Sequence, residues 1–123
     1  MLFSQKRYIF NEIINQNNKI MEYTKEVGEP ISLELAKGWT KDYRTANPGE
    51  IKAHYIGANI INDILAQDGC VGIRTYYALN ELEKKELVMV GVNSSGEDLV
   101  EGIIADRTFP CPTACALSSP LAS

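Results

Sequence analysis

The chain has 123 residues, of which 45% are hydrophobic and 23% charged, and this composition excludes an intrinsically disordered protein. Its twelve basic and sixteen acidic residues give a net charge of −4 and a pI near 5.0. This balance argues against a nucleic-acid partner, because phosphate binding needs clustered Lys and Arg. The length predicts one domain with its own hydrophobic core.

The sequence also bears on where the protein resides. Its longest apolar stretches, such as residues 87–92, are far shorter than the ~20 residues that cross a bilayer, so we expect no membrane partner. Polar Gln5, Lys6 and Arg7 follow the first apolar residues at once, and no secretory signal is expected. Three cysteines are an odd number, which suits a reducing compartment. We therefore expect a cytoplasmic protein.

Residues 1–28 are predicted to form an N-terminal amphipathic arm, separate from a domain at residues 29–107 and a C-terminal tail at 108–123. The tail is rich in Pro, Ser and Ala and is expected to contain no regular element. The apolar positions of the arm suit one stripe of a helix; they are Phe10, Ile13, Ile14, Ile20, Met21 and Val27. The polar run at residues 15–18 leaves two shorter pieces open as an alternative. Gly28 and Pro30 end the arm in either case.

Two helices are expected at the start of the domain. The first begins at the capping residue Ser32 and carries apolar residues three and four apart, namely Leu35, Ala36, Trp39, Tyr43 and Ala46. Asn47, Pro48 and Glu50 fit the N-cap, N1 and N3 positions of a second helix. Its stripe runs down to Ala66 and includes Ile51, Tyr55, Ala58, Ile61, Ile64 and Leu65. The two helices are predicted to form a hairpin.

After Asp68 and Gly69 the apolar period changes to two, which predicts a strand at residues 70–79. A loop at 80–85, a strand at 86–92, a turn at 93–96 and a third strand at 99–105 follow. The predicted fold class is α+β, with the helical hairpin packed on a three-stranded antiparallel sheet and an N-terminal helical arm. We expect Ile73 and Tyr77 to face a core that contains Trp39, Tyr55 and Ile61, with Arg74 and Tyr76 on the opposite face.

Several segments are distinctive in combination, namely Pro30 to Leu33, Trp39 with Tyr43 and Arg44, residues 68–74, residues 87–92, and Pro110 to Pro112 with Cys115. Together they resemble a group of small bacterial proteins of the kind found in Bacteroidetes. In that group a helical half precedes a Gly-Cys-Val-Gly-Ile-Arg strand and a Cys-Pro tail. The resemblance covers residues 30–115, implies one domain plus an appendage, and implies no activity, cofactor or partner.

No motif of catalysis is present. His54 has no orienting carboxylate or nucleophile in the pattern around it, and no Gly-x-Ser-x-Gly occurs. Cys111 and Cys115 are two ligands, whereas structural zinc needs four, and Cys70 and His54 would have to complete the set. The favoured interpretation is that Cys70 is a core residue and the tail pair are neighbouring free thiols, although a small disulfide ring or a soft-metal site is open to them.

The sequence therefore leads to a non-enzymatic module that binds another protein or itself, without a cofactor or metal. The expected interface residues are Phe10, Ile13 and Ile20 of the arm together with Arg74 and Tyr76, because Tyr and Arg are frequent in interface hot spots. We expect a homo-oligomer, most simply a dimer, whose contacts include residues 3–27. The alternative hypothesis is a thiol-based metal-binding or redox module using the C-terminal pair Cys111 and Cys115, with Cys70 as a further candidate.

Overall fold

The computed structural model describes residues 21–122, and the helical arm predicted at residues 1–28 lies largely outside this range. Residues 21–32 precede the first helix without regular secondary structure. Helix α2 (Leu33–Ala46) follows, with Ser32 as N-cap: its Oγ accepts a hydrogen bond from the Leu35 amide at 3.0 Å. The capping residue and the bounds expected for this helix are confirmed.

The predicted second helix is wrong over its first half, and with it the helical hairpin. Strand β1 (Ala53–Tyr55) occupies that region, and helix α3 (Ala58–Leu65) begins only after Gly57, its N-cap. The spacing of Ile51, Tyr55 and Ala58 fits a helix, but Gly57 interrupts it and the 53–55 backbone pairs with another strand instead. Tertiary pairing overrides the helical period here.

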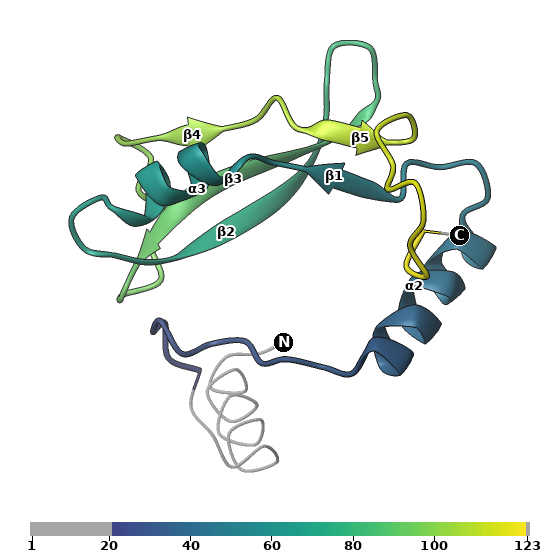
Figure 1. Ribbon diagram of the computed structural model, residues 1–123. Coiled ribbons are helices and arrows are strands. Elements are labelled where there is room, and N and C mark those ends of the chain that lie inside the picture. The colour runs from purple at the N-terminus through teal and green to yellow at the C-terminus, as the bar shows by residue number, and fades with distance from the viewer. Residues whose placement is uncertain (1–20, 123) are drawn as a thin grey trace, which may run out of the picture.

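Two antiparallel sheets form the rest of the fold, which is α+β (Figure 1). The three-stranded sheet has the order β2-β3-β4, from β2 (Cys70–Leu79), β3 (Lys85–Asn93) and β4 (Ile104–Ala105). The β2–β3 hairpin and the turn at residues 93–96 agree with the sequence-based expectation. Gly96 has a φ of 84°, as such a turn requires. The third strand is shorter than the expected 99–105.

The second sheet pairs β1 with β5 (Phe109–Cys111), in register Ala53 with Cys111 and Tyr55 with Phe109. The tail was expected to contain no regular element, because it is rich in Pro, Ser and Ala. Strand β5 corrects that expectation, and it succeeds despite Pro110 because a two-stranded sheet leaves each strand one unpaired edge.

The core lies between α3 and one end of the three-stranded sheet. Ile64 is fully buried, and it packs with Cys70, Ala105 and the partly buried Ile73 and Met89. Alternation alone places Cys70 on the face opposite Ile73, but an irregularity in the β2–β3 register between Cys70 and Gly72 shifts the strand by one residue. The shift brings both side chains to the face that α3 covers.

Trp39 and Tyr55 do not belong to this core, contrary to the sequence-based expectation. Their side chains are 59% and 62% exposed, and α2 contains no buried residue. Tyr77 shares the face of Ile73 but is 93% exposed, because α3 covers only the Ile73 end of the strand. Helix α2 stands apart from both sheets, across the molecule from α3 (Figure 1).

Candidate interaction surface and the cleft beside it

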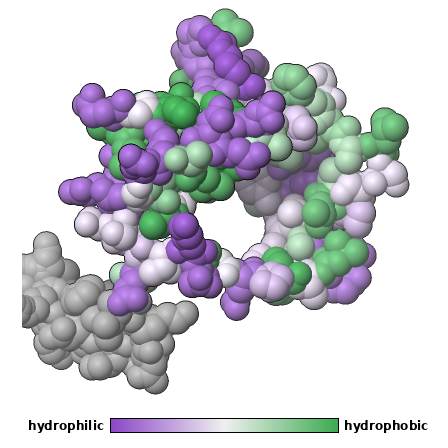
Figure 2. Space-filling model, turned by 60° about the vertical axis from the view of Figure 1, so that its left-hand side comes forward, coloured by the Kyte–Doolittle hydropathy of each residue, from purple (hydrophilic) through white to green (hydrophobic). Residues whose placement is uncertain are grey.

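The apolar face of α2 is exposed in the described chain and does not pack on its core. Leu35, Trp39 and Tyr43 follow one another at intervals of four residues and are 43%, 59% and 40% exposed. Residues four apart share one face of a helix, so these side chains form a single stripe, which we call the α2 stripe. Figure 2 shows hydrophobic side chains on both sides of an opening that passes through the molecule.

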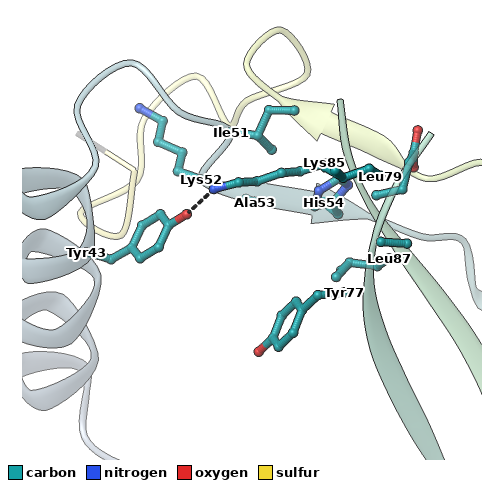
Figure 3. A pocket seen from close by; sticks show the side chains of 11 residues that line it. Tyr43, Ile51, Lys52, Ala53, His54, Tyr77, Leu79, Lys85 and Leu87 are labelled. Atoms are coloured by element: carbon teal, nitrogen blue, oxygen red, sulfur yellow. Dashed lines mark hydrogen bonds between the residues drawn. The ribbon is translucent and has the colours of Figure 1, made fainter. Parts of the chain in front are cut away.

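A cleft of about 870 Å³ adjoins the C-terminal end of this stripe. Its walls come from Tyr43 of α2, from residues 51–54 and from the ends of β2 and β3 (Figure 3). The apolar lining includes the large side chains of Ile51, Tyr77, Leu79 and Leu87. Tyr77 and Leu79 are 93% and 67% exposed, so this part of the sheet is also without cover.

The polar groups of the cleft hold its two sides together. Lys85 Nζ lies 3.3 Å from Tyr43 Oη and 3.2 Å from Glu50 Oε1, and these two contacts raise the pKa of Lys85. Lys52 donates a hydrogen bond to the Ala122 carbonyl at 2.7 Å. Both amines therefore have partners. Lys85 links the β2–β3 hairpin to Tyr43 and Glu50, and Lys52 links the segment before β1 to the C-terminal tail.

His54 lies in β1 rather than in a helix, and it also lines the cleft. Its Nδ1 is 2.9 Å from Oγ1 of the buried Thr108, which precedes β5. A catalytic histidine needs a nucleophile within hydrogen-bond reach and usually a carboxylate that orients it. The Thr108 hydroxyl lies within that reach, but it is buried, and no carboxylate among the described residues is hydrogen-bonded to His54. The contact therefore joins the ring to the residue that precedes β5.

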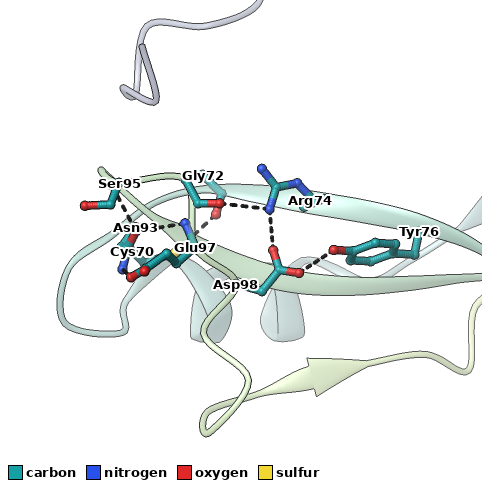
Figure 4. A network of polar contacts seen from close by, with 9 residues as sticks. Cys70, Gly72, Arg74, Tyr76, Asn93, Ser95, Glu97 and Asp98 are labelled. Carbon is teal, nitrogen blue, oxygen red and sulfur yellow. Dashed lines mark hydrogen bonds and ion pairs between the residues drawn. The ribbon is translucent and has the colours of Figure 1, made fainter. Parts of the chain in front are cut away.

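The expected interface residues Arg74 and Tyr76 meet at an acidic residue that the sequence analysis missed (Figure 4). Arg74 Nη1 lies 2.5 Å from Asp98 Oδ1, and Tyr76 donates a hydrogen bond to Asp98 Oδ2. The hydrogen bond from Tyr76, followed by that from Arg74, lowers the pKa of Asp98, while the same contacts raise the pKa values of Tyr76 and Arg74. Arg74 also lies over the Tyr23 ring, 5.7 Å from its centroid.

This cluster joins β2 to the loop after β3. Tyr76 is 46% exposed and the Arg74 side chain 32%, so both remain accessible while paired. The alternation of β2 correctly grouped Arg74 with Tyr76. It gave no sign of Asp98, because that residue is more than twenty positions away and reaches β2 only through the bridge between Val92 and Asp98.

Cys70 does not join Cys111 and Cys115 in a three-residue metal-binding cluster among the described residues. Cys111 and Cys115 are joined in a disulfide, so the interpretation of them as free thiols is wrong. Cys70 is buried in the α3 core, where its Sγ contacts the Gly72 carbonyl at 3.3 Å. Among residues 21–122, no cluster of three or more His, Cys, Asp or Glu could hold a metal ion. A disulfide persists most readily in oxidising compartments, which weakens the cysteine argument for a cytoplasmic location.

Other sequence-based expectations fall outside what the structure tests. Phe10, Ile13 and Ile20 precede the described residues. Within the part that is described, no helix has the length and apolar character needed to cross a membrane. Comparison of the chain with protein-family models, curated proteins and solved structures found no match. The resemblance to small Bacteroidetes proteins thus stays a prediction.

Proposed function

We propose that this chain is a non-enzymatic module that associates with a second copy of itself through the α2 stripe. The observation that carries the proposal is that α2, an amphipathic helix of 14 residues, has no buried residue in the described chain. Isolated helices of this length are marginal in water, and most helical stability in proteins comes from burial of the apolar face. Helix α2 therefore needs a cover that the rest of residues 21–122 does not supply.

A second copy is the occupant that the sequence favours. The arm carries its own apolar stripe, with Phe10, Ile13 and Ile20, and such a segment matches an exposed apolar helix face. Exchange of arms between two copies closes with twofold symmetry, so that the α2 stripe of each copy is covered once. The cleft beside Tyr43 adds exposed Tyr77 and Leu79 to the area available for burial.

Trp39 is the only tryptophan, and its fluorescence reports directly on this surface. On raising the concentration of the full chain over about a thousandfold range, the emission maximum moves to shorter wavelength as the ring becomes covered. Leu35→Gln removes an apolar member of the stripe and weakens the shift. Lys41→Gln changes an exposed residue on the opposite side of α2 and leaves the shift intact.

An emission maximum that is independent of concentration, in a full chain that sediments as a monomer, would contradict the proposal. The stability of Trp39→Ala supplies a second measurement. Because the ring is exposed in the single chain, the substitution costs less than about 1 kcal/mol in dilute solution, far below the ~3–5 kcal/mol expected for a core aromatic. A loss in the core range at low concentration would place Trp39 in the interior of the monomer.

A further inference from the structure

Among the described residues, the outer edge of β2 is a second surface without a partner, distinct from the α2 stripe. In the three-stranded sheet the order is β2-β3-β4, so one side of β2 pairs with β3 and the other side faces outward. Among the described residues, no backbone hydrogen bond joins this outer side to another segment. An extended edge of unpaired N–H and C=O groups is a template for strand addition.

Natural proteins usually protect such edges, and β2 lacks the common protective features. Its ten residues contain no proline and no lysine, and its one irregularity lies at the start, between Cys70 and Gly72. The only charged residue, Arg74, is neutralised by Asp98. Tyr77 and Leu79 are largely exposed, at 93% and 67%. From residue 73 to 79 the strand has a regular register and its one charge is paired with Asp98. Its outer edge makes no backbone hydrogen bond to another described residue.

We propose that β2 pairs antiparallel with β2 of a second copy about a twofold axis at Tyr76, joining the two sheets into one. In this register Ile73 lies opposite the partner copy's Leu79, Thr75 opposite its Tyr77, and Arg74 opposite its Ala78. Directly opposed residues share a face, so apolar Ile73 and Leu79 meet on the side that carries α3. An axis at Arg74 would instead place two arginines against each other.

The surroundings of the edge leave room for the second strand. The segment that precedes α2 passes on the side of β2 away from β3 (Figure 1) and makes no backbone hydrogen bond to that strand. A cleft of about 660 Å³ lies there, bounded by Tyr23 and Val27 on one side and by residues 71–75 of β2 on the other. The end of the partner strand, near its Leu79, enters this cleft in the proposed register.

The two edges of the three-stranded sheet limit the β2 contact to two copies. The opposite edge of the sheet is β4, which is only two residues long, Ile104–Ala105. A strand so short cannot template a second addition, and an isologous contact at β2 uses its edge in both copies. Taken alone, the β2 contact therefore gives a closed dimer and not a fibre.

A charge-pair experiment on the full chain tests the register. The double substitution Thr75→Lys with Tyr77→Lys places lysines opposite each other across the axis, and sedimentation velocity is expected to show a shift from dimer to monomer. The matched variant Thr75→Glu with Tyr77→Lys alters the same two positions but places opposite charges together, and it remains a dimer. Both positions are exposed and face uncharged Met89 and Leu87 within the monomer, so the fold tolerates either change.

Circular dichroism confirms that both variants retain the native fold before sedimentation is compared. A full chain that is monomeric at all concentrations, or two variants with the same association state, would overturn the proposal. The outcome is separable from that of the α2 stripe. If the two charge variants differ as expected while Trp39 emission is the same in monomer and dimer, β2 pairing stands and the α2 proposal fails. If the two charge variants do not differ but the Trp39 emission shifts with concentration, the α2 proposal stands and the β2 pairing fails.

Discussion

At the scale of single residues, close packing decides which positions tolerate change. Gly91 lies in the central strand β3 at the point where α3 approaches. A Cβ atom at this position would lie 2.9 Å from Cys70 Sγ and from Gln67 Nε2, and 3.3 Å from Ile64 Cγ2. Glycine is therefore required here by the approach of neighbouring side chains, whereas a Cβ at Gly72 in β2 would meet nothing within 4 Å.

The first prediction compares these two glycines. Gly91→Ala destabilises the fold by about 1–3 kcal/mol, because the added methyl group overpacks the core around Ile64. Gly72→Ala is the matched control in the partner strand and changes stability by less than about 0.5 kcal/mol. Urea denaturation of both variants measures the difference. Equal stabilities would show that α3 does not pack against β3 at this point.

Single residues of β2 also show what the two-residue alternation in the sequence could predict and what it could not. Alternation correctly placed Arg74 with Tyr76 and Ile73 with Tyr77, because a regular strand has a fixed period of two. It did not give the one-residue shift at Cys70 and Gly72, which arises from pairing with β3. Nor did it distinguish the covered Ile73 from the exposed Tyr77, since exposure depends on where α3 ends.

At the scale of elements, side-chain bridges join segments that the backbone leaves apart. Gln67, just after α3, accepts a hydrogen bond from the Ile103 amide at 2.9 Å and donates one to the Ile64 carbonyl at 2.9 Å. It thereby ties the end of α3 to the residues that lead into β4. The sequence gave no indication of this role, because the two ends of the bridge are 36 positions apart.

Gln67→Ala is expected to cost about 1–3 kcal/mol of folding stability, because it leaves the Ile103 amide without its acceptor. Asn59→Ala, at an exposed position of α3, serves as the control and has a much smaller effect. Thermal unfolding of the two variants beside the unmodified chain checks this. A Gln67 variant no less stable than the control would mean that water replaces the lost bond.

The cluster of Arg74, Tyr76 and Asp98 is expected to make the folding stability depend on pH in the acidic range. The folded pKa of Asp98 lies below its ordinary value near 3.8, so its contribution to stability is present at neutral pH and is lost as the pH falls through the folded pKa. The denaturation midpoint of the unmodified chain should therefore fall more steeply below about pH 4 than that of Asp98→Asn. Tyr76→Phe removes the hydrogen bond that contributes most to the lowered pKa of Asp98.

NMR titration of the Asp98 carboxyl carbon measures this directly. In Tyr76→Phe the pKa of Asp98 moves upward toward its ordinary value, while Arg74 still holds it partly down. Tyr55→Phe, a tyrosine outside the cluster, leaves the titration unchanged. An Asp98 that titrates identically in all three proteins would show that the cluster does not form in solution.

At the scale of the whole molecule, one element is held far less firmly than the others. The contacts of α2 with the rest of the described chain include the hydrogen bond from Arg44 to the Leu121 carbonyl, at 2.6 Å, and the contact between Tyr43 and Lys85. The helix and its cap were predictable because both are local features of the sequence. Its separation from the core was not, since the same amphipathic stripe is expected for a helix packed on a sheet.

This arrangement predicts two levels of protection against amide hydrogen exchange. In dilute solution the amides of α2 exchange by local opening, at least about tenfold faster than those of β3, which lies in the centre of the sheet and contains buried Val90 and Val92. At high protein concentration the second copy covers the α2 stripe, and protection of α2 rises while that of β3 changes little. Exchange measured by mass spectrometry at two concentrations, with Leu35→Gln as the variant that weakens the contact, separates the two effects. Equal protection of α2 and β3 in dilute solution would show that α2 already belongs to the core of the single chain.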